Sequence, residues 1–289
     1  MEPHVALLVI ASAVIHPLRE FFIKDNRYPE GLTFSVIAMF GILSGIQVLV
    51  TGADPWAAAA VWPAVLISGA GVILFYYCTI ATLRHGDLSI YYPIIRSSPL
   101  FVVVVGFLLL GQRYSPQLLV GVGVVLVGAF FLQYRPGVRL LDQPKALGLA
   151  VLGMSAHGAL TLADAEALRV VTPMEFFFFL YLFLIPVAGV MLAMARPRGR
   201  PVAEHLFAGW RLTPGRYLFA GLTSYLSYYL LLTAFHLGGN VAAVSALRQI
   251  SIPVSVFLGG MVLKESRMGG RLAWSAVLAA GVVIILVSR

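Results

Sequence analysis

The sequence predicts an all-α membrane protein with ten transmembrane helices in two inverted five-helix repeats. Its 289 residues are 60% hydrophobic and 11% charged, with a mean hydropathy of +0.92, whereas roughly a quarter of a soluble domain is charged. Ten mainly apolar runs can be marked along the chain, each close to the ~20 residues that a spanning helix needs. The two halves of the chain also resemble each other.

The ten predicted spans leave only short loops, so almost nothing remains for a separate soluble domain. In chain order the spans cover residues 5–24, 32–52, 57–82, 88–110, 116–133, 146–168, 174–195, 217–237, 240–263 and 272–288. The longest connection, 196–216, contains five arginines. It is the one loop that could hold an amphipathic helix on the membrane surface, with Leu206, Phe207 and Trp210 on the apolar side.

An internal repeat relates residues 1–139 to residues 140–289, and we expect each part to form one five-helix repeat. A shift of about 152 residues, or of 141 for the histidines, gives the clearest matches: Tyr76 and Tyr77 with Tyr228 and Tyr229, Arg96 with Arg248, and His16 with His157. Because five is an odd number, the second repeat must enter the membrane from the opposite face. Inverted repeats of this kind are used by secondary transporters, whose sites lie near the bilayer midplane.

Two arginines lie deep inside predicted spans that prolines interrupt. Arg96 and Arg248 are each eight residues into their spans, or roughly 12 Å, where an isolated arginine costs several kcal/mol. The prolines near them are Pro93, Pro99 and Pro253. Broken helices at this depth either line a cavity or are buried in protein. We expect both guanidinium groups to face one central cavity and to bind a phosphate or a carboxylate.

Histidines and acids in the first and sixth predicted spans extend this prediction and also offer an alternative to it. His16 and His157 would add hydrogen bonds beside the cavity, and Glu20 and Asp164 are candidates for proton coupling. Alternatively, the arginines hold the carbonyls of the broken helices, or pair with Glu20 or Asp164. Asp164 is most simply an interfacial residue with water access, and Glu20 could form a structural pair with Arg19.

Aromatic residues are abundant in the spans. Five tyrosines of the matched third and eighth spans could line the cavity, namely Tyr76, Tyr77, Tyr225, Tyr228 and Tyr229. Of these, Tyr77 and Tyr229 are expected to shape the cavity walls, although tyrosines near span ends are also ordinary interfacial residues. The run from Phe176 to Phe179 points in every direction around a helix. We therefore expect much of that run to contact lipid and assign it no function.

Glycines at helical spacing predict close helix packing, which is either internal or between two copies in a homodimer. They are Gly41 and Gly45 in the second span and Gly121, Gly123 and Gly128 in the fifth.

Several functional classes lack their motifs in this sequence. It contains no phosphate-binding loop for ATP, no His-Glu-x-x-His and no Gly-x-Ser-x-Gly. The lone Cys78 lies in an apolar run and supports neither a disulfide framework nor a cysteine metal site. We predict no cofactor and no metal. The net charge of +8 reflects basic loops rather than nucleic-acid binding.

The basic residues are unevenly distributed between the two sets of loops. The odd-numbered loops hold fourteen, and the other side holds three, namely Arg113, Arg169 and Arg289. The positive-inside rule then places the odd-numbered loops in the cytoplasm and both termini outside.

The junctions between spans four and five and between spans nine and ten carry related sequences. They read Leu109-Leu110-Gly111-Gln112 and Val262-Leu263-Lys264-Glu265, each after a proline-containing span. With the ten-span repeat, they resemble the drug/metabolite transporter superfamily in its EamA-like form. The Gly-Glu pair frequent in that family is split here, because each junction keeps one of its two residues. The resemblance implies a multi-pass protein of a bacterial inner membrane with both termini inside. On orientation we favour the charge count.

Together these features predict a secondary transporter, not an enzyme, that moves a small anionic solute across the bilayer by alternating access. The solute would carry a phosphate or a carboxylate, and a proton gradient is one energy source. A flippase for a phosphate-bearing lipid is a close alternative. A membrane enzyme acting on a lipid-linked substrate is another, although no nucleophile with a positioned base is visible. A non-transporting assembly partner is a third.

Overall fold

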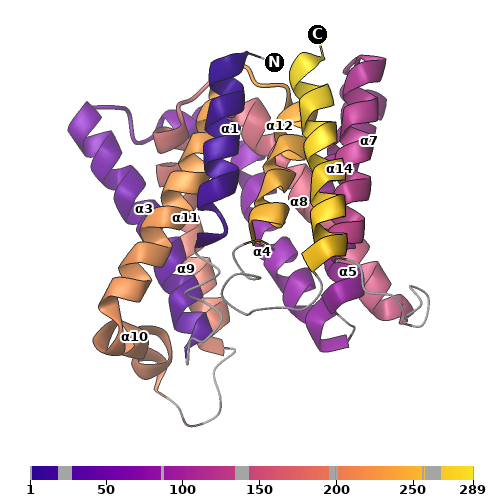
Figure 1. Ribbon diagram of the computed structural model, residues 1–289. Helices are drawn as coiled ribbons and strands as arrows, with labels where there is room; N and C mark the ends of the chain where they lie inside the picture. The colour runs from indigo at the N-terminus through magenta and orange to yellow at the C-terminus, as the bar shows by residue number, and fades with distance from the viewer. Residues whose placement is uncertain are drawn as a thin grey trace.

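The computed structural model describes residues 2–18, 28–85, 88–133, 143–194, 199, 201–255, 257 and 268–288, and every regular element within them is a helix (Figure 1). The helices are α1 (Pro3–Ile15), α3 (Pro29–Thr51), η1 (Ala57–Val61), α4 (Trp62–His85), α5 (Leu88–Ile95), α6 (Ser98–Leu108), α7 (Pro116–Gln133), α8 (Pro144–Ala167), α9 (Pro173–Met194), α10 (Val202–Leu212), α11 (Pro214–His236), α12 (Val241–Leu247), η2 (Arg248–Ile250) and α14 (Met268–Val287).

Five of the helical stretches are long and apolar enough to cross a bilayer: Glu30–Thr51, Ala57–Thr79, Pro144–Ala167, Pro173–Met194 and Pro214–His236. Shorter apolar stretches overlap the other five predicted spans, and they are Pro3–Ile15, Pro93–Leu108, Pro116–Leu132, Val241–Ser255 and Ala273–Val287. The predicted all-α class therefore holds for the described residues, and membrane-spanning helices are present.

Proline and glycine mark where several helices begin and end. Pro3, Pro29 and Pro144 lie in the first turns of α1, α3 and α8, where the missing N–H has no helical partner to lose. Gly52 follows α3 with φ +69°, a left-handed conformation that ends a helix and costs glycine little. The local sequence thus defines the helix limits that the apolar runs alone leave uncertain.

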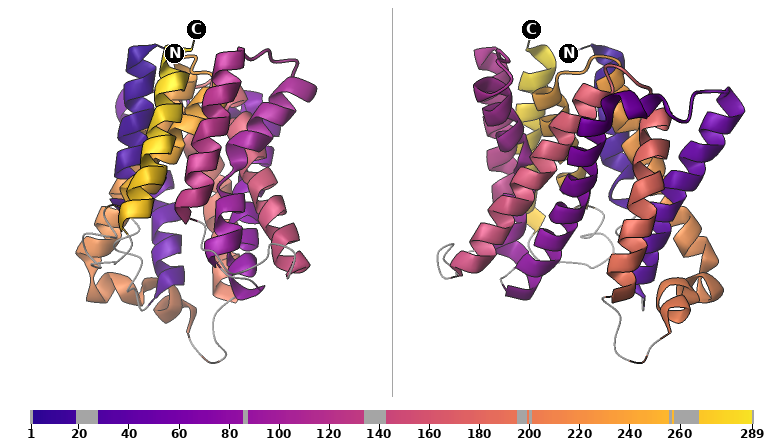
Figure 2. Two further views of the ribbon diagram at one scale, coloured as in Figure 1. Left: turned by 45° about the vertical axis from the view of Figure 1, so that its right-hand side comes forward. Right: turned by 180° about the vertical axis from the view of Figure 1, so that it is seen from behind.

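The main helix pairs join elements that are distant in sequence. α1 packs along α11, α4 along α8, α3 along α9, and α7 along α14. Figure 1 shows the two termini at one end of the bundle and α10 at the opposite end. The rear view in Figure 2 shows α4 and α8 diverging from α9 toward the end with α10, and α3 leaning away from the bundle at the end with the termini. Each half of the chain therefore packs mainly against the other half.

The predicted glycine contacts are internal at four of the five positions. A Cβ atom on Gly128 would lie 2.7 Å from the backbone nitrogen of Leu278 on α14, and one on Gly121 would lie 2.7 Å from Ile285. A Cβ on Gly41 or Gly45 would meet side chains of α9. Gly123 has nothing within 4 Å. Close backbone approach between α7 and α14 therefore depends on Gly121 and Gly128.

Gly128→Ala should destabilise the protein because the new methyl group meets the backbone of α14 rather than a movable side chain. Overpacking of this kind costs about 1–3 kcal/mol, which should appear as a lower thermal denaturation midpoint in detergent. Gly123→Ala on the same helix is the matched control, and we expect it to leave the midpoint unchanged or raise it. Equal midpoints for the two variants would contradict the observed α7–α14 packing.

The predicted surface helix is present as α10, across one end of the bundle (Figure 1). Leu206 is 4% exposed, and Trp210 Nε1 donates a hydrogen bond of 2.7 Å to Ser35 Oγ on α3. Phe207 packs edge-to-face against Phe34, with ring centroids 5.7 Å apart. The predicted apolar side of α10 is thus directed largely against the bundle, although Phe207 stays partly exposed.

The expectation that much of the run from Phe176 to Phe179 contacts lipid is wrong. Phe176, Phe177 and Phe179 are buried and Phe178 is partly buried. The reason is that α9 is covered on several sides, by α3, α4 and η1. Phe177, for example, packs edge-to-face against Phe40 of α3 at 5.2 Å between ring centroids.

Candidate functional site

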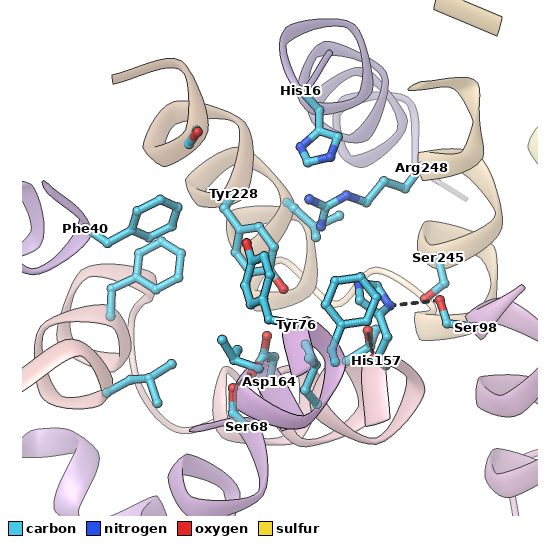
Figure 3. A pocket seen from close by; sticks show the side chains of 18 of the residues that line it. His16, Phe40, Ser68, Tyr76, Ser98, His157, Asp164, Tyr228, Ser245 and Arg248 are labelled. Carbon is cyan, nitrogen blue, oxygen red and sulfur yellow. Dashed lines mark hydrogen bonds between the residues drawn. The ribbon is translucent and has the colours of Figure 1, made fainter. Parts of the chain in front are cut away.

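A cavity of about 250 Å³ lies among the helices, and side chains from both parts of the chain form its wall. His16, just after α1, lines it from the first part of the chain, together with α3, α4 and the α5–α6 junction. α8, α9, α11 and the α12–η2 junction line it from the second part. Figure 3 shows this cavity with its labelled side chains. Polar and charged groups from distant parts of the sequence therefore meet in one place.

Arg96 lies where the predicted broken helix is interrupted. α5 ends at Ile95 and α6 begins at Ser98, so Arg96 and Ser97 form a turn between the two helices. Arg96 lines the cavity, and its Nη2 donates a hydrogen bond of 2.7 Å to Ser251 Oγ. Among the described residues it forms no ion pair, and its Nε has no hydrogen-bond partner. The guanidinium group therefore keeps an unused donor.

Arg248 occupies the corresponding interruption in the second half. α12 ends at Leu247, and Arg248 begins the short 3₁₀ helix η2. Its guanidinium carbon lies 4.6 Å from the ring centroid of Tyr228, within the range of a cation–π interaction. Figure 3 shows the side chain reaching toward His16. Both arginines thus lie at helix breaks and line the same cavity.

Hydrogen bonds connect the two helix breaks directly. Gln249 Nε2 donates to the carbonyl oxygen of Arg96 at 3.0 Å, and Ser251 accepts from the Arg96 side chain. Gln249 Oε1 and Ser245 Oγ are buried and have no hydrogen-bond partner among the described residues. Unsatisfied buried polar groups are costly, and these two belong to residues that line the cavity.

The two histidines reach the cavity from different helices. His16 follows the last residue of α1, and His157 lies in the middle of α8. His157 Nδ1 is 2.8 Å from Ser98 Oγ, at the start of α6, and its ring lies 4.8 Å from that of Phe75. These contacts fix the orientation of the imidazole.

Asp164 is a buried residue of the cavity wall, so its interpretation as an interfacial residue is wrong. Its side chain is 2% exposed, and its Oδ1 accepts a hydrogen bond of 2.5 Å from Ser68 of α4. The acid that does lie at the surface is Glu166, which pairs with Arg169 at 3.3 Å. Asp164 is directed inward because it lies seven residues, about two helical turns, after His157. Glu20 and Arg19 lie outside the described residues.

Comparison with known protein families gives a match to the first part of the chain. Residues 5–134, which run from α1 to α7, match the model of the EamA-like transporter family. The first part of this chain is an EamA-like segment. The predicted resemblance to the drug/metabolite transporter superfamily is thereby confirmed.

Two further similarities concern a short stretch of sequence and the complete fold. A UDP-N-acetylglucosamine transporter of Arabidopsis thaliana is 32% identical over 59 residues, which are 20% of this chain and 17% of that protein. A solved crystal structure has a TM-score of 0.77 at 16% identity, covering 98% of this chain and 96% of the other. The second similarity shows that nearly the complete chain shares a known fold.

The tyrosines that line the cavity are the sequence neighbours of Tyr77 and Tyr229, the pair expected to shape its walls. Tyr76 and Tyr228 are in the wall, whereas Tyr77 and Tyr229 are not. Tyr77 is 59% exposed, and Tyr229 stacks on Tyr225 with ring centroids 5.8 Å apart. Adjacent residues point about 100° apart around a helix, so a shift of one position changes the face.

Helical spacing contained a signal for the tyrosines that line this cavity. Two helices carry a serine, an aromatic residue and other wall residues on one face: Ser68, Val72, Tyr76 and Thr79 on α4, and Ser224, Tyr228, Leu231 and Phe235 on α11. Their spacing of three or four residues is that of one helical face. The sequence interpretation also missed Ser98, Ser245 and Gln249, because small polar residues are common in membrane helices and carry little signal alone.

The EamA-like segment and the second part of the chain thus build one polar site between them. Two guanidinium groups, two imidazoles and one carboxyl group contribute to its wall. Arginine donors in a planar arrangement suit the paired oxygens of a carboxylate or phosphate. The described residues contain no cluster of three or more metal-ligating side chains. The wall thus contains groups that can donate hydrogen bonds to an anion, together with one carboxyl group.

Proposed function

We propose that this protein is a secondary transporter that moves a small anionic organic solute across a membrane by alternating access. The single observation that carries the proposal is that Arg96 and Arg248, from opposite parts of the chain, line one cavity among the helices. A buried arginine inside a membrane protein is expensive unless it has a function or a partner. The EamA-like segment supports transport, and the two arginines support an anion.

The proposal includes ten spans in two inverted repeats, residues 1–139 and 140–289. The helix contacts support it, because exchanging the two parts converts one contact pair into another. The α1–α11 contact becomes the α8–α4 contact, while the α3–α9 and α7–α14 contacts are each converted into themselves. A bundle with this twofold relation has two equivalent ways of opening, one toward each side of the membrane. Alternating access then consists of exchange between them.

The substrate is proposed to carry one phosphate or carboxylate group. His16 and His157 would supply further hydrogen bonds to it. The relative from Arabidopsis is named for a UDP-sugar, whose diphosphate makes it an anion, and this similarity favours the same chemical class. The substrate would bind by exchanging water for charge-assisted hydrogen bonds from the two guanidinium groups.

Asp164 is proposed to couple transport to a proton gradient. It interacts electrostatically with Arg248, and it shares the cavity with both arginines. When Asp164 is ionised it competes with the substrate anion for positive charge. A proton on Asp164 removes that competition, so the proton and the anion would bind together.

The α10 end of the bundle is proposed to face the cytoplasm of a bacterial cell. Arg211 and Arg216 lie at that end, on α10 and at the start of α11. Arg113 lies at the opposite end, near Glu2 and Ser288. The positive-inside rule assigns the more basic side to the cytoplasm, and both termini are then outside.

Uptake by sealed proteoliposomes is the experiment that tests this function. Purified protein should accumulate radiolabelled benzoate or phenyl phosphate, faster with an inward proton gradient, and Arg96→Gln should reduce uptake to that of empty liposomes. Translocation of a fluorescent phospholipid instead would identify a flippase. Chemical conversion of a lipid-linked substrate without movement would identify an enzyme. Either result, without uptake of any small anion, would contradict the proposal.

A further inference from the structure

The cavity has two chemically different walls, and we infer that its substrate is a small planar aromatic acid, with an aromatic ring at one end and one anionic group at the other. This inference rests on the proposed function and specifies its substrate class. Figure 3 shows the division: Phe40 lies on one side of the cavity, and Arg248, His157, Ser245 and Ser98 lie on the other. Tyr76 and Tyr228 lie between the two sides in this view.

The aromatic wall consists of side chains from α3, α9 and α11. The Phe40 ring stacks on Tyr181 with centroids 4.8 Å apart, and it meets Phe177 edge-to-face at 5.2 Å. Phe177 in turn lies 5.9 Å from the Tyr228 ring. All four residues line the cavity. A ring added beside this cluster would find both faces and edges to pack against, which is the geometry that aromatic pairs favour.

The polar wall is built at the two helix breaks and on α8. Arg96 lines this wall, with its Nη2 donating a hydrogen bond to Ser251, and His157 is held by Ser98. The Arg248 guanidinium group lies over the Tyr228 ring, where the cation–π contact fixes its plane. An anionic group would therefore be held at this wall, while the ring bonded to it would extend past Tyr228 to Phe40 and Phe177.

Size and charge restrict the substrate further. Pockets for drug-sized ligands commonly enclose ~300–1,000 Å³, and the cavity volume here is about 250 Å³. One ring with one acidic group fits this scale better than a nucleotide sugar. The Phe40 side of the cavity offers no basic side chain among the described lining residues, so a second, distant carboxylate would lack a partner there. Asp164 in the wall would repel a second negative charge.

A matched pair of ligands tests the inference on the full-length protein in detergent. Benzoate and cyclohexanecarboxylate have the same charge and similar size, but only benzoate has a planar π system. Isothermal titration should give a dissociation constant for benzoate that is lower by on the order of tenfold. Succinate, with two carboxylates and no ring, should bind more weakly than either.

Two variants connect this preference to the aromatic wall. Phe40→Leu and Tyr181→Leu should each reduce the ratio of the two dissociation constants toward one, because an aliphatic side chain packs equally well against either ligand. Phe107→Leu is the control, since Phe107 is 61% exposed on α6 and outside the cavity wall, and it should keep the ratio of the unmodified protein. Two leucine variants are used so that the test can still be made if one of them fails to fold.

The outcomes separate this inference from the proposed function. If benzoate, cyclohexanecarboxylate and succinate bind equally well and are all taken up by proteoliposomes, the aromatic substrate class is wrong and anion transport stands. If neither binding nor uptake of any of the three is detected, both proposals fail. A preference for benzoate that survives in both leucine variants would also overturn the assignment of the aromatic wall.

Discussion

Arg96→Gln and Arg248→Gln should each weaken benzoate binding by at least roughly 30-fold, because truncating one partner of a buried charge-assisted contact costs about 2–5 kcal/mol. Glutamine keeps a polar group of similar length but removes the positive charge. The measurement is isothermal titration of the purified protein, together with the rise in denaturation midpoint on adding benzoate. We expect this rise to disappear in both variants.

The ligand-free stability of Arg96→Gln should distinguish a binding residue from a structural one. Arg96 has a donor without a partner and forms no ion pair among the residues that the structure describes. Its removal costs the hydrogen bond to Ser251 but also takes away a buried charge without an ion-pair partner, so we expect the ligand-free denaturation midpoint to stay close to that of the unmodified protein. Arg216→Gln, an exposed position on α11, is the control for loss of one charge, and we expect normal benzoate binding. A large drop in ligand-free stability of Arg96→Gln would indicate that Arg96 holds the helix break together instead.

Asp164→Asn should abolish proton-driven accumulation while preserving exchange of substrate across the membrane. Asparagine resembles the protonated carboxyl group, so the variant should bind benzoate as tightly at high pH as the unmodified protein does at low pH. Proteoliposomes that contain Asp164→Asn should exchange labelled for unlabelled benzoate at a normal rate. They should not concentrate it when an inward proton gradient is applied.

Controls for this prediction must address the other titratable groups of the cavity. His16 and His157 also line the wall, together with the two arginines and with Tyr76 and Tyr228. Protonation of a histidine would likewise favour anion binding at low pH. If the pH dependence persists in Asp164→Asn but is lost in His157→Gln, histidine is the coupling group and our assignment is contradicted. Glu166→Gln, which removes a surface acid of the same helix, should change nothing.

The arginine pair could be predicted from the sequence because two independent signals coincide there. A bilayer makes arginine costly, which singled out Arg96 and Arg248 among many polar residues. The internal repeat then placed them at corresponding positions, and prolines indicated the helix breaks at which the structure shows them. A repeated, energetically expensive residue is a signal that does not depend on knowing the three-dimensional packing.

The rest of the site depended on information that single positions do not contain. Choosing between Tyr76 and Tyr77 requires knowing which face of α4 lines the cavity. Ser68, a polar residue on the same helical face as Tyr76, could have indicated that face. Asp164 looked interfacial because it lies late in its span, and only its packing against α4 shows that it is buried. Phe177 was indistinguishable from its neighbours, because a run of phenylalanines shows no preferred face until the partner helices are known.

The central claim is that Arg96 and Arg248 together bind one anion inside the helix bundle. Crystals of the protein grown with 4-bromobenzoate, measured at the bromine absorption edge, test it most directly. The account predicts a carboxylate within hydrogen-bond distance of both guanidinium groups and an anomalous bromine peak beside Phe40 and Phe177. A bromine peak outside the cavity, or a carboxylate that contacts neither arginine, would contradict it.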